Sequence, residues 1–206
     1  CIPIEEANER FEEAIMVIRK GWTTEGRFSH EGKRWRYKDV MIEPAPTQLP
    51  HPPLWMAAGR TESLQYAARE GYNLFLDQFQ TFDVILERLA IYRDALEASG
   101  RTYDPLSVAV ARGLFIAKER EEAIAARMKA LEMMNAYGSS GDNKSSMVSD
   151  ADLMKATKEG VLLGGPDEII ERLKKLEAGG VGYILLSSRT QGALRTFAKE
   201  VMPAFA

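Results

Sequence analysis

The polar stretch Gly59–Ser63 carries residue types that bind a phosphate group. It follows an apolar run that ends at Ala58 and precedes apolar residues at helical spacing, so it is predicted to join a buried strand to a helix. Loops of this kind lie at the carboxyl ends of parallel strands, where α/β proteins bind ligands. The glycine permits close approach, Arg60 supplies positive charge, and Thr61 and Ser63 supply hydroxyl groups beside the N–H groups of a helix start.

The same residues also fit a plain helix cap. In that interpretation Thr61 is the N-cap residue, and Arg60 and Glu62 are simply exposed to water. Composition alone leaves both interpretations open.

Three further segments carry polar groups at the ends of predicted strands or within them. Gln78 follows the next strand and is a second candidate for contacting a ligand, although amides at strand ends also form turns. Ser187-Ser188-Arg189 ends the last strand, where barrels often bind phosphate, with a polar turn as the alternative. Arg112 interrupts an apolar strand, so it is expected at a barrel mouth or paired with a carboxylate, and we favour a structural role.

Several classes of function are disfavoured by the composition. The 206 residues have a formal net charge of −3 and no basic stripe, which argues against nucleic acid as a partner. No apolar run approaches the length of a membrane helix, and the single cysteine, Cys1, favours a reducing compartment, the cytoplasm. Neither His30 nor His51 has partners at ligand spacing, so no metal site is predicted. We assign no catalytic residue.

Helices and strands alternate along most of the chain. Amphipathic helices are predicted over 4–20 and about 82–99, with Thr81 as an N-cap, and another opens at Gly164-Gly165-Pro166. Parallel strands are predicted at roughly 54–58, 73–77, 108–116 and 182–187. The last of these is almost entirely apolar and is expected to be buried on both faces. This order predicts a parallel sheet flanked by helices, either a barrel or a doubly wound sheet.

Two segments lack a regular apolar pattern. Residues 23–53 are rich in glycine and proline, with two short strand candidates, and are predicted to be an insertion. Residues 138–160 begin with a polar, glycine- and serine-rich stretch and are predicted to form a mobile loop.

Five segments together resemble the carboxyl-terminal portion of the bacterial luciferase-like flavin-dependent monooxygenases. They are Arg10–Thr23, the spaced Phe28, Gly32 and Trp35, Pro44–Gly59, Ser63–Phe75 and Gly164–Leu186. The resemblance implies that residues 1–206 supply the later strands and helices of one (β/α)8 TIM barrel with insertions. It also implies that Ala58, Gly59, Arg60, Thr61 and Ser63 hold a flavin phosphate, with Gln78 near the flavin edge or the substrate.

The function implied is that of a monooxygenase, an enzyme that uses reduced FMN and O2 to oxygenate a small organic substrate. A separate flavin reductase would supply the reduced FMN, the loop at 138–150 would act as a lid, and a homo-oligomer is expected. Two alternatives stay open. One is an oxidoreductase of the same fold that uses the deazaflavin F420, and the other is a non-catalytic barrel subunit that serves assembly or binding.

Overall fold

The structure is a computed structural model that describes residues 3–117, 121–122, 124–129 and 159–206. The chain divides into two compact units, Cys1–Pro53 and Leu54–Ala206. The predicted loop at 138–160, and with it the predicted lid, falls outside the described residues except at its last two positions.

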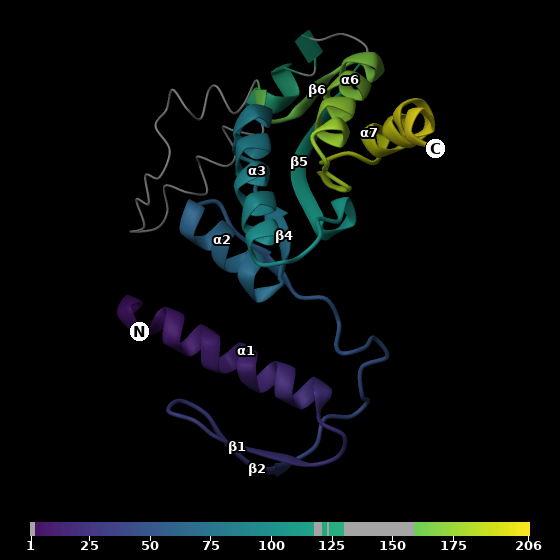
Figure 1. Cartoon of the computed structure of the whole chain (residues 1–206). Helices are drawn as coiled ribbons and strands as arrows, with labels where there is room; N and C mark the ends of the chain where they lie inside the picture. The colour runs from purple at the N-terminus through teal and green to yellow at the C-terminus, as the bar shows by residue number, and fades with distance from the viewer. Residues whose placement is uncertain (1–2, 118–120, 123, 130–158) are drawn as a thin grey trace. The chain divides into compact units, whose positions relative to one another are not determined.

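The first unit consists of a helix and a β-hairpin (Figure 1). A short 3₁₀ turn, Ile4–Glu6, leads into helix α1, Ala7–Thr23, and antiparallel strands β1, Phe28–Glu31, and β2, Arg36–Val40, follow. Glu13 of α1 joins the two parts, because its carboxylate accepts hydrogen bonds from the backbone N–H groups of Arg34 and Trp35 in the hairpin turn. The helix predicted over 4–20 is present as α1. The two strand candidates, at Trp35/Tyr37 and Val40/Ile42, both fall at the single strand β2, and β1 was not predicted.

The second unit contains a parallel sheet of five strands. In chain order its elements are β3, Trp55–Ala57; α2, Thr61–Glu70; β4, Asn73–Leu76; α3, Phe82–Ala98; β5, Val108–Ile116; β6, Leu162–Gly164; α6, Pro166–Ala178; β7, Tyr183–Ser187; and α7, Gln191–Thr196. A 3₁₀ turn, Pro105–Ser107, precedes β5, and the chain ends in a π-helical turn, Phe197–Val201, and a 3₁₀ turn, Met202–Phe205.

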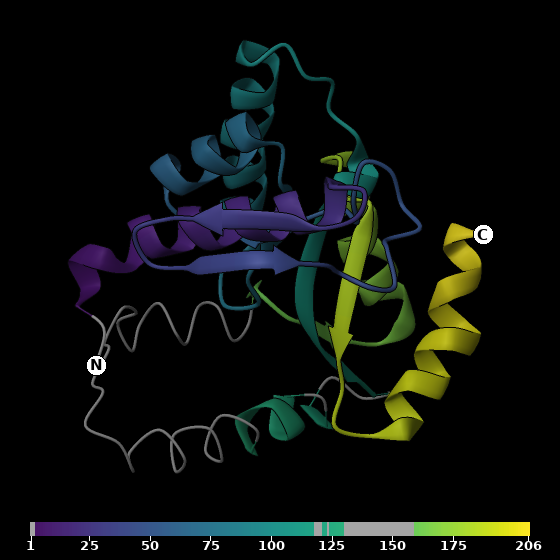
Figure 2. The ribbon, with the colours of Figure 1, turned by 90° about the horizontal axis from the view of Figure 1, so that it is seen from below.

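Strand β5 is the centre of the sheet. It pairs with β4 through its first residues, with β7 through Ala109–Gly113, and with β6 through its last residues. Strand β3 pairs with β4. Figure 2 shows β5 and β7 running side by side, as expected of neighbouring strands in a barrel wall.

Apolar side chains on one face of the sheet form the core with the helices. Its fully buried members include residues of α2, β4, α3, β5 and α6: Leu64, Ala67, Leu74, Leu76, Ile85, Leu89, Val108, Val110, Ile169 and Leu176. The predicted apolar stripes of α2 and α3 are thus confirmed.

The opposite face of the sheet is more exposed. Residues of β3 and β7 on this face, Trp55 and Tyr183, bring their ring centres within 6.2 Å of each other although three strand pairings separate them. The sheet therefore curves, with this face concave, as in a barrel wall.

One prediction about the strands is wrong, and one strand was missed. Strand β7 is not buried on both faces, because Tyr183 and Leu185 lie on the concave face and are about half exposed. Strand β6 was not predicted, and its last residue, Gly164, was instead taken as the opening of the next helix.

Candidate functional site

A cavity of about 270 Å³ lies at the carboxyl ends of β3 and β4. It is lined by Ala57, Ala58, Gly59, Phe75 and Asp77. Four of these five belong to the ends of two neighbouring parallel strands or follow them directly, and three have small side chains or none. This is the edge at which α/β proteins bind ligands.

The predicted loop runs from this cavity into the start of α2. Ala58 is buried, and its N–H donates to the carbonyl of Phe75 at 3.4 Å, which keeps the loop next to β4. Arg60, in extended conformation, is the N-cap residue of α2, and Thr61 is the first helical residue. The alternative that placed the N-cap at Thr61 is therefore wrong by one residue.

Ser63 is engaged in the start of its own helix. Its Oγ donates to the carbonyl of Arg60 at 2.9 Å and accepts from the N–H of Arg60 at 3.2 Å. Its hydroxyl proton is thus already in a hydrogen bond. The donors available to an anion here are the first N–H groups of the helix, which have no partner within it, and the exposed side chains of Arg60 and Thr61.

Gln78 lies in a turn that Asp77 organises. The Asp77 Oδ1 accepts from the N–H groups of Phe79 and Gln80 at 2.7 and 3.1 Å, which closes a turn around the half-buried Gln78. Gln78 follows the carboxyl end of β4, as predicted, and its contact with a cofactor stays a prediction.

Arg88 of α3 reaches this edge, and the sequence analysis did not single it out. Its Nη1 lies 2.5 Å from Asp77 Oδ2, and its guanidinium lies against Gly59. The feature of the sequence that could have identified Arg88 is its position on α3, three residues after the buried Ile85 and one before the buried Leu89. That spacing predicts a half-buried arginine but not its partner.

Arg112 is fully buried on the helix-covered side of β5. Its Nη1 donates to the carbonyls of Asp77 and Ala111, both at 2.8 Å, and its guanidinium carbon lies 5.0 Å from the centre of the Phe82 ring. Burial lowers the pKa of Arg112 to about 10, and the nearby Asp77 charge partly opposes that shift. The predicted structural role fits this environment, but the hydrogen bonds go to carbonyls and not to a carboxylate.

The remaining sequence candidates have structural partners. Ser188 Oγ contacts the backbone of Thr190, the N-cap residue of α7, so the segment after β7 forms the polar turn given as the alternative. His30 lies 3.3 Å from Glu13, and His51 Nδ1 lies 2.7 Å from the carbonyl of Pro52. No cluster of three potential metal ligands occurs among the described residues. Within the same residues no helix has both the length and the apolar character needed to cross a membrane.

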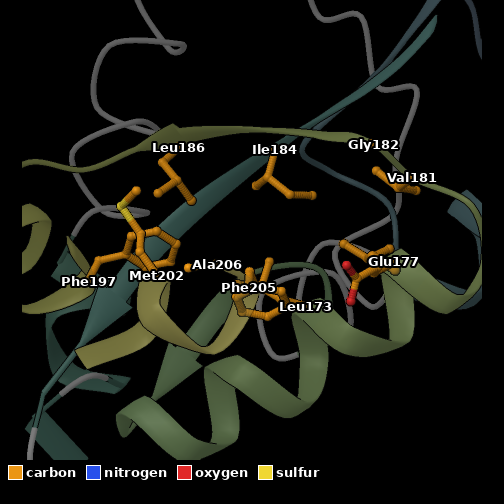
Figure 3. Close-up of a pocket in the computed structure, with 11 residues that line it drawn as sticks. Leu173, Glu177, Val181, Gly182, Ile184, Leu186, Phe197, Met202, Phe205 and Ala206 are labelled. Atoms are coloured by element: carbon orange, nitrogen blue, oxygen red, sulfur yellow. The ribbon is translucent and has the colours of Figure 1, made fainter. Parts of the chain in front are cut away.

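A larger cavity of about 610 Å³ lies between α6, β7 and the carboxyl-terminal turns (Figure 3). Its lining is apolar apart from Glu177, and Ile184 and Leu186 point into it from the helix-covered face of β7. Because it lies under the helices and not at the carboxyl ends of the strands, we regard it as a gap in the packing between layers.

The curved parallel sheet, its covering helices and a cavity at the strand ends define part of a (β/α)8 barrel with a ligand-binding edge. Residues 2–182 match the luciferase-like monooxygenase family, and the chain belongs to that family. The fold and family predicted from the sequence are therefore confirmed.

Two curated relatives and one solved structure illustrate the similarity. The oxygenase component of flavin-dependent trigonelline monooxygenase from Acinetobacter baylyi is 24% identical over 220 residues, covering 97% of this chain and 61% of that protein. The FMNH2-dependent dimethylsulfone monooxygenase of Pseudomonas putida is 26% identical over 218 residues, covering 97% and 58%. A monooxygenase from Streptomyces bottropensis has a TM-score of 0.79 at 26% identity, covering 100% of this chain and 64% of that one. The chain thus spans about three fifths of the length of its relatives.

Proposed function

We propose that this chain forms the phosphate-binding side of a flavin-dependent monooxygenase that uses reduced FMN and O2 to oxygenate a small organic substrate. The FMN phosphate binds at the loop formed by Ala58, Gly59, Arg60, Thr61 and Ser63, with Gln78 near the flavin edge or the substrate. Family membership and the names of the two curated relatives support the class of reaction.

The observation that supports the proposal most directly is the run of small residues that connects β3 to α2. Ala57, Ala58 and Gly59 line a cavity at the strand ends, and the N–H groups that begin α2 follow directly. A helix start beside a residue without a side chain suits a phosphate, because the N–H groups and the helix dipole both favour negative charge. The residues present therefore fit the phosphate of FMN.

Each loop residue has a distinct task in this proposal. Arg60 supplies the positive charge and offsets the neighbouring Glu62 of the first helical turn. Thr61 offers a hydroxyl donor, while Ser63 holds the backbone of Arg60 in position through its two hydrogen bonds. Reduced FMN, when bound, supplies the electrons for activating O2. The protein supplies binding, orientation and exclusion of water.

The partners follow from the same proposal. A separate flavin reductase would deliver reduced FMN, in line with the description of one relative as an oxygenase component. Homo-oligomerisation and a cytoplasmic location remain predictions from the resemblance and from the single cysteine.

Titration of the full-length protein with FMN tests the site. Arg60→Ala should weaken FMN binding roughly ten-fold, as expected for the loss of a charge-assisted contact to phosphate. Ser63→Ala should weaken it less, because Ser63 acts through the Arg60 backbone. Arg69→Ala, at the opposite end of α2, is the matched control and should leave the affinity unchanged.

Unchanged affinity in both loop variants would remove the assignment of this site. A parallel titration with F420 separates the two cofactors, since tighter binding of F420 than of FMN would favour the deazaflavin oxidoreductase. If neither cofactor binds, the non-catalytic subunit becomes the better account.

A further inference from the structure

Asp77 uses all of its acceptor groups at the junction of two loops. Its Oδ1 closes the turn around Gln78, and its Oδ2 lies 2.5 Å from Arg88 Nη1. Its backbone carbonyl accepts from Arg112 Nη1 at 2.8 Å. The residue is therefore held from the turn, from α3 and from β5 at the same time.

Arg88 extends this arrangement to the loop after β3. A Cβ built on Gly59 would lie 3.1 Å from the guanidinium carbon and from Nη1, and 3.2 Å from Nη2. Three nearly equal distances to a planar group mean that its face lies over Gly59. Because Gly59 does not have a left-handed backbone, the closeness of Arg88 is the steric feature that disfavours a side chain there.

The Arg88–Asp77 pair differs from an ordinary surface ion pair. Its side chains are 19% and 36% exposed, whereas those of Lys175 and Asp83, a pair that also involves α3, are 53% and 74% exposed. An exposed pair contributes little to stability because water screens it and both side chains lose freedom. In the Arg88–Asp77 pair the carboxylate is already oriented by the two N–H groups of the turn. The Asp77 side chain therefore loses less conformational entropy when the ion pair forms.

We propose that Arg88, oriented by Asp77, is a positioning residue that fixes the Gly59–Arg60 backbone for the cofactor phosphate. The inference rests on the proposed function, since it assigns a role at the same site. Backbone N–H groups bind an anion well only when they are held in place beforehand, because otherwise binding must order the loop. The Arg88 guanidinium packs against Gly59 and so restrains the loop backbone before the anion binds. The Asp77 carboxylate neutralises the charge of that guanidinium.

The test compares FMN with riboflavin, which has the same ring system but no phosphate. In the full-length protein, Arg88→Met should weaken FMN binding roughly ten-fold and leave riboflavin binding unchanged. Asp77→Asn keeps an acceptor for the turn but removes the ion pair, so it should act in the same direction. Asp83→Asn removes the exposed pair that α3 makes with α6, and it should change neither affinity.

A double-mutant cycle tests the contact itself. Gly59→Ala should weaken FMN binding when Arg88 is present, because the new methyl group displaces the guanidinium. In the Arg88→Met background the same change should have a clearly smaller effect. Arg88→Lys should restore part of the preference for FMN over riboflavin, since an ammonium group can pair with Asp77 but cannot cover Gly59.

The outcomes separate the two proposals. If the unchanged protein prefers FMN over riboflavin and Arg88→Met keeps that preference, the role of Arg88 is wrong while the phosphate site stands. Equal effects of Gly59→Ala in both backgrounds would also overturn it, because Gly59 would then act without Arg88. If the unchanged protein shows no preference for FMN, the phosphate site is wrong and the inference fails with it. Thermal unfolding identifies any variant that fails to fold, in which case Asp77→Asn and Gly59→Ala carry the test.

Discussion

Tyr92 places a phenol hydroxyl inside the apolar layer between α3 and the sheet. The side chain is 2% exposed, and its hydroxyl donates to the carbonyl of Tyr72 at 2.8 Å, just before β4 begins. Burial raises the pKa of the Tyr92 phenol. The hydrogen bond joins α3 to the chain that enters β4, and it satisfies a carbonyl that is out of reach of water.

Tyr92→Phe should therefore destabilise the second unit. The substitution keeps the ring and its packing but removes the buried hydrogen bond to the Tyr72 carbonyl, which should lower the free energy of unfolding by about 1–2 kcal/mol. Urea unfolding followed by circular dichroism measures the change. Tyr183→Phe is the control, because the Tyr183 ring is about half exposed, and it should change the value by less than about 0.5 kcal/mol. Equal effects of the two changes would mean that the buried hydrogen bond contributes nothing of its own.

For single residues, the sequence predicts which side chains are buried better than it predicts which groups they contact. The inward positions Ile85, Leu89 and Tyr92 follow from helical spacing alone, and all are buried. The engagement of Ser63 with the Arg60 backbone and the reach of Arg88 to Asp77 depend on side-chain conformations and on neighbouring loops. Residue spacing carries no information about either. The residue types of the phosphate loop were therefore predictable, but the residue that supports it was not.

The helix–hairpin element of the first unit depends on carboxylates of α1. The Trp35 N–H, together with the Arg34 N–H and His30, lowers the pKa of Glu13 against the opposing effect of burial. The pKa of Glu6 is lowered chiefly by Arg10, and that of Glu9 chiefly by Lys33. The ionised forms of these carboxylates therefore favour the folded element.

The first unit should lose stability in acid, and Glu13→Gln should reduce that loss. A carboxyl with a lowered folded-state pKa contributes stability above its unfolded pKa, and the contribution disappears as pH falls through the folded pKa. Thermal unfolding of the full-length protein between about pH 6 and about pH 3 should show a smaller decrease for Glu13→Gln than for the unchanged protein. Glu31→Gln, in β1, for which no ion pair is described among the residues of the first unit, should behave like the unchanged protein. A pH dependence of Glu13→Gln that matches the unchanged protein would contradict this role.

Helices and strands with a clear hydrophobic pattern were predictable. A very short strand, and the burial of a strand covered on one face only, were not. Strands β4 and β5 and helix α3 lie within one or two residues of the predicted ranges. Strand β6 has three residues and depends on its pairing with β5, which lies far away in the sequence. Strand β7 has the apolar composition of a strand buried on both faces, yet helices cover only one of its faces among the described residues. The composition of a strand shows that its side chains are apolar enough to be buried. It does not show whether another layer covers each face.

The second unit contains a curved sheet with an apolar concave face. Trp55, Tyr183 and Leu185 on that face are 41%, 47% and 50% exposed. Among the described residues, β3 pairs only with β4 and β7 pairs only with β5. Sheet edges with free backbone groups and contiguous apolar surface both favour association with further polypeptide.

Residues 1–206 produced alone should therefore bind the dye ANS and self-associate. Leu185→Lys places a charge on the concave face and should lower both ANS fluorescence and the apparent mass measured by light scattering. Leu106→Lys is the matched control, because Leu106 is also exposed but lies in the 3₁₀ turn before β5 and not on the concave face, so it should change neither. A monomeric 1–206 chain that does not bind the dye would mean that its concave face is covered by the chain itself. A chain that completes the barrel should bind less ANS, since a closed barrel buries the inner faces of its strands against one another.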